Sequence, residues 1–172
     1  MAWTSRPLRQ LHPGIALIEH RSAPGEAAKI AAETAHLVLP DERNQARHLA
    51  NVARLVLLRD EGGWWSDYDL IPLVPFTNLP MNATAAHWLG MRCNCWMAFE
   101  AGHPALTLAL DLIVAAADGP PTYSTQVSGE RILDAACNDD VARMQLCLDS
   151  NGLVNTAAEP WAIHLGGSLR GV

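Results

Sequence analysis

Two aspartates, Asp67 and Asp69, stand two residues apart directly after a Gly-Gly-Trp-Trp-Ser run. Residues 64–70 are rich in aromatic side chains and alternate in character, which predicts a short strand. Because successive side chains of a strand point to opposite faces, both carboxylates are expected on one side at its end. They repel each other unless water solvates both or a cation lies between them, and a hard divalent ion is the natural occupant. The spacing therefore predicts a site for Mn²⁺ or Mg²⁺ with phosphate groups.

The elements that must position these aspartates alternate between helices and strands. The clearest helix covers 44–61, where apolar residues recur at helical spacing and Gly62-Gly63 follows as a stop. Further helices are expected over 25–38, 104–117, 128–137 (with Ser128 as the N-cap) and 140–148, and further strands over 15–19, 87–91, 95–99 and 162–165. This order predicts one α/β domain over 1–172 whose central sheet, flanked by helices, is mostly parallel, or mixed with an antiparallel pair near 87–99.

The composition narrows the class of protein. The 172 residues carry 12 basic and 18 acidic side chains, a net charge of −6, and 49% hydrophobic residues, which excludes a disordered chain and a basic nucleic-acid binder. The longest apolar stretch, 106–117, is broken by Asp111 and falls short of the roughly 20 residues that a membrane helix needs. The first residues lack the apolar run of a signal peptide. We therefore expect a cytoplasmic protein with no membrane span and no nucleic-acid partner.

Neither the cysteines nor the scattered histidines have the spacing of a common metal site. In a reducing compartment the four cysteines are most simply buried thiols. The scattered histidines are expected at the surface or as helix caps. The residues concerned are Cys93, Cys95, Cys137 and Cys147, and His12, His20, His36, His48 and His87.

The segment from Arg54 to Asp69, followed by an apolar turn, resembles the signature of the DXD-motif glycosyltransferases, a family that includes bacterial capsular and mannosyl-type transferases. Weaker similarities follow at Asn94, Gly102-His103-Pro104, Ser128-Gly129 and 162–168, so that the resemblance covers residues 44–168. It implies a GT-A domain that moves a hexosyl unit from a nucleotide-diphosphate sugar to a sugar or protein acceptor, with retention of configuration and with Mn²⁺ or Mg²⁺.

Carried over position by position, the resemblance implies a role for each matching residue. Asp67 contacts the donor ribose or the metal, Asp69 binds the metal at the diphosphate, and Arg54 holds the sugar or phosphate; these three are the expected catalytic residues. His164 is a candidate third metal ligand, the alternative being a strand-end histidine bonded to backbone groups. The remaining expected donor-binding residues are Asn51, Gly62, Gly63, Trp65, Tyr68 and Ser168. The aromatic residues among them stack on the donor or belong to the core.

The sequence also departs from the family pattern. Asn51 stands where the family usually has an aspartate that grips sugar hydroxyls, and Leu169 replaces a closing tryptophan. The family's first apolar strand is not recognisable, so we expect an N-terminally shortened domain in which Trp3, or another subunit of a homo-oligomer, supplies the wall for the base. The alternative function is therefore a catalytically impaired module that binds a nucleotide sugar or carbohydrate or serves in assembly.

A phosphatase of the haloacid-dehalogenase type also carries an Asp-x-Asp sequence. In that family the motif follows an apolar strand and precedes Thr or Val. Here Gly-Gly-Trp-Trp-Ser precedes Asp67, and Leu70 follows Asp69. The local sequence therefore favours the transferase interpretation over the phosphatase.

Overall fold

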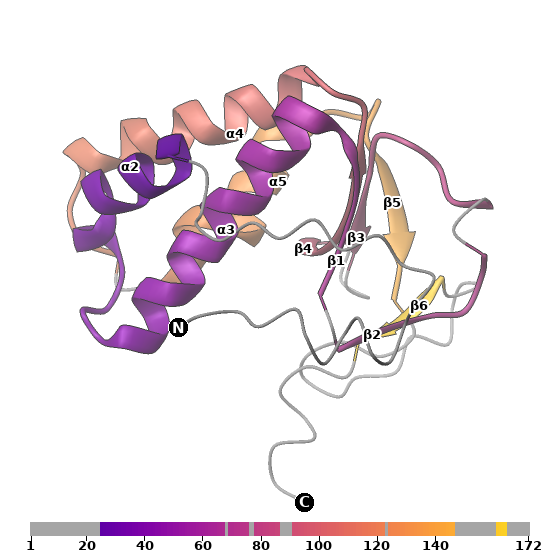
Figure 1. Cartoon of the computed structure of the whole chain (residues 1–172), viewed down its shortest axis with the longest axis horizontal. Coiled ribbons are helices and arrows are strands. Elements are labelled where there is room, and N and C mark those ends of the chain that lie inside the picture. Colours follow the sequence, from indigo (N-terminus) through magenta and orange to yellow (C-terminus); the bar gives the residue numbers. More distant parts are fainter. Residues whose placement is uncertain are drawn as a thin grey trace, which may run out of the picture.

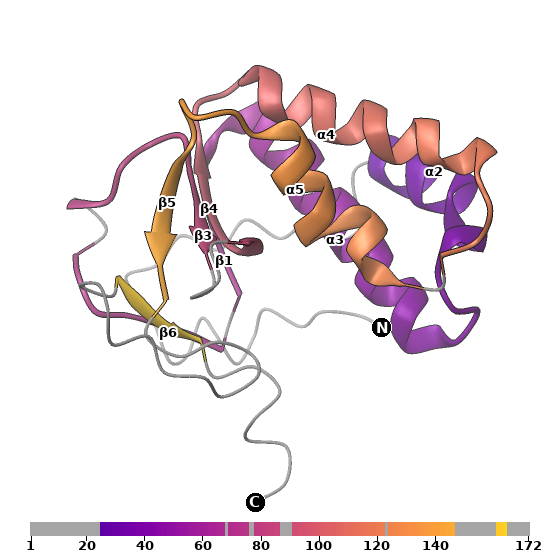
Figure 2. The ribbon, with the colours of Figure 1, turned by 180° about the vertical axis from the view of Figure 1, so that it is seen from behind.

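The computed structural model describes residues 25–67, 69–75, 78–86, 91–122, 124–146 and 161–164. Its helices gather on one side and a small sheet stands beside them, as both views show (Figures 1 and 2). The predicted strand over 15–19 and the proposed wall residue Trp3 lie outside the described residues. Within these ranges, no helix has both the length and the apolar character needed to cross a bilayer.

Within the described residues, the helical layer is built from four α-helices and short 3₁₀ turns. Their bounds are α2 Gly25–Glu33, η1 Ala35–Leu37, α3 Glu42–Glu61, α4 Pro104–Ala115, η3 Ala116–Asp118, η4 Thr125–Ser128 and α5 Glu130–Ala136. The long helix α3 begins at the N-cap Asp41, whose side chain accepts a hydrogen bond from the Asn44 amide, and it ends at Gly62. The helix predicted over 44–61 is thus confirmed to within two residues.

The described strands form one four-stranded and one two-stranded sheet. Their bounds are β1 Gly63–Ser66, β2 Leu70–Pro72, β3 Ala83–Ala86, β4 Arg92–Phe99, β5 Ala142–Gln145 and β6 Ala162–His164. The larger sheet has the order β1-β4-β3-β5, with β4 antiparallel to both neighbours and β3 parallel to β5. The second sheet pairs β2 antiparallel with β6. The prediction of a mixed sheet is confirmed, and the mostly parallel alternative is wrong for the described strands.

The core lies on both faces of the sheet. One cluster joins α3 to the helical layer through residues such as Val52, Leu55 and Leu106, and it includes Met97 and Phe99 of β4. The second cluster holds the earlier part of the same strand, Cys93, Cys95 and Trp96, against β5 and β6. Three of the expected buried thiols are confirmed, since Cys93, Cys95 and Cys137 are buried and free, whereas Cys147 lies outside the described residues.

The change of face along β4 results from an irregularity in its pairing. Thr84 of β3 lies opposite Met97, but the next residue, Ala85, lies opposite Cys93. The extra residues 94–96 on β4 form a bulge, which interrupts the strict alternation of side chains and re-aims backbone groups. The bulge places the Asn94 carbonyl toward α3, where it becomes part of the site described below.

Several local predictions are corrected by the structure. The segment 140–148, predicted as a helix, contains strand β5, because pairing with β3 overrides the helix-forming character of its residues. The strand expected over 87–91 falls on residues 87–90, which lie outside the described residues, and the described strand that precedes them is β3. Ser128 is not the N-cap of α5; Gly129 takes that position, and the Ser128 hydroxyl bonds elsewhere. The predicted strand 64–70 is interrupted after Ser66.

Candidate functional site

Asp67 lies at a corner of the chain rather than within a strand. Its amide donates to the Cys95 carbonyl (2.8 Å), which extends the pairing of β1 with β4 by one residue, and its own carbonyl accepts from the Leu70 amide (3.3 Å). The chain therefore turns through residue 69 before β2 begins. The same-face argument for Asp67 and Asp69 fails for this reason, and their relative placement is set by the turn.

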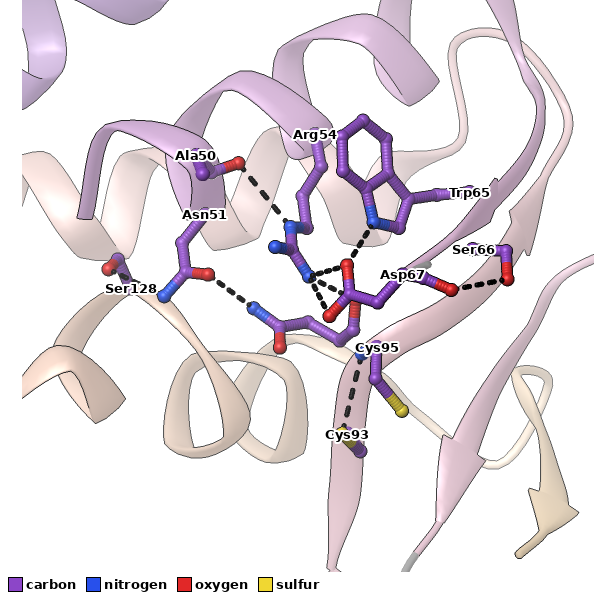
Figure 3. A network of polar contacts seen from close by, with 10 residues as sticks. Ala50, Asn51, Arg54, Trp65, Ser66, Asp67, Cys93, Cys95 and Ser128 are labelled. Atoms are coloured by element: carbon purple, nitrogen blue, oxygen red, sulfur yellow. Dashed lines mark hydrogen bonds and ion pairs between the residues drawn. The ribbon is translucent and has the colours of Figure 1, made fainter. Parts of the chain in front are cut away.

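Asp67 is held by Arg54 and Trp65, as Figure 3 shows. Arg54 Nη1 lies 3.2 Å from Asp67 Oδ1, and Trp65 Nε1 donates to the same oxygen at 2.9 Å. The Arg54 guanidinium also lies over the Trp65 ring, 4.9 Å from its centroid, in cation–π contact. Trp65 thus contributes to both groups of the ion pair, and one face of its ring is taken by Arg54.

Arg54 is buried, with 6% of its surface exposed. It reaches the sheet from α3, because Nη1 donates to the Asn94 carbonyl at 2.6 Å, while Nε bonds back to the Ala50 carbonyl of its own helix at 3.3 Å. A buried guanidinium needs such partners, since desolvating a charge is costly unless it is paired and hydrogen-bonded. The β4 bulge therefore supplies part of the support for this cation.

The side chain of Asn94 begins a second set of polar contacts, separate from the contact of its carbonyl with Arg54. Asn94 Nδ2 donates to Asn51 Oδ1 (3.0 Å), and Asn51 Nδ2 donates to Ser128 Oγ (3.4 Å). Ser128 Oγ lies 2.8 Å from His48 Nδ1, and His48 Nε2 lies 2.7 Å from Thr34 Oγ1. This chain of hydrogen bonds joins β4, α3 and η4 to the end of α2. We refer to its five residues as the relay: Asn94, Asn51, Ser128, His48 and Thr34.

The relay corrects the expectation for His48. Its side chain is not at the surface and caps no helix; it is fully buried, with 0% exposure. Burial lowers the pKa of His48 below its ordinary value of 6.5, so the ring is neutral at pH 7. One sequence signal pointed here: His48, Asn51 and Arg54 recur every third position of α3, a spacing that brings neighbouring polar side chains to one side of a helix.

Gly62 and Gly63 form the joint between α3 and β1. Gly62 has φ +67° and its amide donates to the Leu58 carbonyl (2.9 Å), which closes the helix. A Cβ at Gly62 would stand 2.6 Å from the Ala101 backbone nitrogen. The close approach of residue 101 thus gives this glycine a structural role, and its predicted donor contact stays a prediction.

The structure brings together the two segments of the chain that carry the candidate metal ligands Asp69 and His164. Leu70, next to Asp69, pairs with His164 across β2 and β6, so distant parts of the sequence meet beside the Asp-x-Asp turn. Asp69 is half-buried, and the side chain of His164 is outside what the structure describes, as are Tyr68 and Ser168. Among the described residues, no three His, Cys, Asp or Glu side chains gather as a ready metal site.

The donor chemistry of the two aspartates fits a hard cation. The side chain of Asp67 is 28% exposed, and among the described residues its Oδ2 makes only a 3.5 Å contact with Arg54. A carboxylate offers about four lone-pair sites, so this oxygen retains capacity for a further partner. The neighbouring thiols do not compete: a hydrogen bond with Cys93, burial and nearby negative charge raise the pKa of Cys95, which stays protonated.

Comparisons with known proteins give a fold but no family. No family model matches the sequence, and no curated protein matches it. A solved structure of PaToxG glycosyltransferase is similar with a TM-score of 0.51 and 19% sequence identity. The match covers 64% of this chain and 38% of that chain, so this chain matches well under half of the neighbour's length. The described part of the chain therefore has a glycosyltransferase-like fold.

Proposed function

We propose that this protein transfers a hexosyl unit from a nucleotide-diphosphate sugar to a sugar or protein acceptor, with retention of configuration as in the DXD-motif family. The observation that carries the proposal is the buried Arg54, held at the end of β1 by Asp67, Trp65 and the Asn94 carbonyl. The glycosyltransferase-like fold supports it. So does the pairing of β2 with β6, which brings His164 into the neighbourhood of Asp69.

Each residue of the site has a task in this chemistry. When the glycosidic bond breaks, negative charge develops on the diphosphate, and a preorganised guanidinium such as Arg54 stabilises that charge without reorganising. Asp67 and Trp65 fix the orientation of Arg54, which is the structural condition for such preorganisation. Asn51, Gly62, Gly63, Tyr68 and Ser168 complete the proposed donor site.

Mn²⁺ or Mg²⁺ would be held by Asp69 and Asp67, with His164 as third ligand. The oxygen donors of both aspartates are the type that these cations prefer. When bound, the cation neutralises charge on the diphosphate leaving group. A binding role without transfer is the second candidate, favoured by one observation: Asn51 offers an uncharged amide where the family usually has an aspartate, and that amide is engaged with Asn94.

The test begins with binding. Mn²⁺ together with UDP or GDP should raise the melting temperature of the protein, and the Asp69→Ala variant should lose that rise. Asp111→Ala is the matched control, since Asp111 is an exposed aspartate on α4 and its removal should leave the rise intact. Absence of stabilisation by any nucleotide diphosphate with metal contradicts the transferase and leaves only a carbohydrate-binding or assembly role.

Turnover separates the two candidates. A screen of nucleotide-diphosphate sugars with Mn²⁺, monitored by release of nucleotide diphosphate, needs no knowledge of the acceptor. Hydrolysis that disappears in Arg54→Met and Asp69→Ala supports transfer. Binding without release of nucleotide, for every donor tried, supports the binding module.

A further inference from the structure

The relay is a chain of uncharged hydrogen bonds in the interior. Thr34 and His48 are fully buried, with 0% exposure, and Ser128 is 1% exposed. Water therefore cannot reach these three side chains to replace a missing partner. A donor or acceptor left without a partner among them would destabilise the fold, because its hydration is lost on burial. The donor and acceptor roles of Thr34 and His48 are consequently set by their neighbours.

The direction of the relay follows from its buried end. Thr34 Oγ1 lies 2.6 Å from the Ile30 carbonyl, which can only accept, so the single hydroxyl proton of Thr34 is used there. Thr34 Oγ1 must then accept from His48 Nε2–H. A neutral imidazole that carries its proton on Nε2 presents a lone pair on Nδ1, and Ser128 donates its hydroxyl proton to that lone pair.

The same direction continues through the amides. With its proton on His48, Ser128 Oγ accepts from Asn51 Nδ2, and Asn51 Oδ1 accepts from Asn94 Nδ2. Asn94 in turn presents its backbone carbonyl to Arg54 Nη1. The orientation of the Asn51 amide in the proposed donor site is therefore fixed from the far end of the relay, and Arg54 is held through the same residue of β4.

We infer that His48 and Ser128 are positioning residues for the donor site: the Nε2–H form of His48 sets which end of the Asn51 amide faces Asn94 and which faces Ser128. This inference rests on the proposed function. It also explains the amide at residue 51. An aspartate there could only accept, so it would draw the Ser128 hydroxyl proton away from His48 and leave His48 Nδ1 without its donor.

The first test reads the relay without any ligand. In the ¹⁵N spectrum of the imidazoles at pH 7, His48 should show the neutral Nε2–H form, with its signals assigned by their loss in His48→Asn. In Asn51→Asp, the titration midpoint of His48 should move upward, because Nδ1 gains a proton of its own to donate to Ser128. A neutral Nδ1–H form in the unmodified protein, or an unchanged midpoint in a folded Asn51→Asp variant, would overturn the inference.

The second test compares two amides at the position of His48. In His48→Asn, the side-chain oxygen lies near the former Nδ1 and can still accept from Ser128. In His48→Gln, the amide reaches the former Nε2 position and can satisfy Thr34 instead. Affinity for UDP-glucose and for GDP-mannose is measured by calorimetry with Mn²⁺, alongside affinity for UDP and GDP and the free energy of unfolding.

For whichever sugar nucleotide binds, His48→Gln should weaken its binding about three- to tenfold while His48→Asn stays within about twofold of the unmodified protein. Binding of the bare nucleotide should be equal in both. Equal losses for the two variants would reduce His48 to a structural role and overturn the inference. If the unmodified protein binds no sugar nucleotide at all, the proposed function fails, and the spectrum of His48 still tests the direction of the relay.

Discussion

The two sets of contacts that meet at Asn94 differ in charge and in exposure. Toward β1 lie Arg54 and Asp67, a charged pair whose carboxylate is 28% exposed. Toward α2 lies the relay, which is uncharged; its inner residues Thr34, His48 and Ser128 are buried, whereas Asn51 and Asn94 are partly exposed. A partly exposed carboxylate with spare lone pairs, held by a buried guanidinium, can receive a charged ligand. A buried neutral chain of hydrogen bonds can only fix the orientation of the groups at its end.

Helix α3 contributes to both sets of contacts, with a charged residue to one and a neutral residue to the other. Arg54 and His48 both project from α3, yet the first lies at the sheet edge and the second between two hydroxyls. A change at the charged end should therefore affect stability through an uncompensated charge, and a change at the neutral end through an unsatisfied hydrogen bond. The following predictions test this difference, beginning with the largest expected effect.

Arg54→Met should lower the free energy of unfolding by about 3 kcal/mol, since it leaves the Asp67 carboxylate without its cation and the Asn94 carbonyl without this donor. Arg59→Met, five residues along α3, removes pairs with Glu26 and Asp60 that are screened by solvent, and should cost less than about 1 kcal/mol. Urea denaturation of both variants measures the difference, and equal losses would contradict the distinction between the buried Arg54 and the partly exposed Arg59.

Gly62→Ala should lower the free energy of unfolding by about 2 kcal/mol. The positive φ of Gly62 strains any other residue, and the new Cβ would press on Ala101, so that α3 and β1 shift against each other. At Gly63 the φ is also positive, but a Cβ would meet nothing within 4 Å. Gly63→Ala should therefore cost about 1 kcal/mol, from backbone strain alone. Denaturant midpoints compare the two, and a larger loss at Gly63 would refute the steric argument.

Thr34→Val should cost about 1–2 kcal/mol, because it leaves the buried His48 Nε2–H without an acceptor. Thr34→Ser keeps the hydroxyl and removes only a methyl group, so most of the stability should return. Thermal and chemical unfolding of the two variants measure how much of the loss in the free energy of unfolding is due to the hydroxyl group. If serine gives no recovery, packing rather than hydrogen bonding holds this end of the relay.

Acid should weaken the protein through His48. Its pKa in the folded chain lies below the ordinary 6.5, so the unfolded chain binds a proton first as the pH falls. The free energy of unfolding should decrease as the pH falls from about 6.5 to the folded pKa, by at most about 1.4 kcal/mol per pH unit, and level off below it. His48→Gln should lose this dependence, which urea denaturation at a series of pH values measures.

The local sequence predicted the elements whose patterns are complete within themselves. The apolar stripe of α3 and its two following glycines located that helix, and Pro104 marked the start of α4, where the His103 side chain accepts from the Ala105 amide (3.3 Å) as N-cap. The buried state of three cysteines was also predicted, because their spacing fits no common metal site. The bounds of these helices depend on residues that are close together in the sequence, so they could be predicted without knowledge of the tertiary structure.

Features that depend on distant partners were missed or displaced. Residues 142–145 became a strand because β3 offers a parallel edge, and the predicted strand 64–70 breaks because Asp67 turns the chain toward β6. Burial of His48 required Thr34 on one side and Ser128, eighty residues away, on the other. The spacing of His48, Asn51 and Arg54 places them on one side of α3, but no local pattern identifies their distant partners.

The sequence by itself determined the types of group at the site: a guanidinium, two closely spaced carboxylates and the glycine joint that precedes them. The tertiary structure alone decided how they are used. In the folded chain Asp67 pairs with Arg54 and accepts a hydrogen bond from Trp65, and β6 lies beside the Asp-x-Asp turn. Asn51 is linked to the buried His48 through Ser128. The physical reason is that charge and hydrogen-bonding capacity belong to single residues, whereas desolvation and partner choice belong to the packing around them.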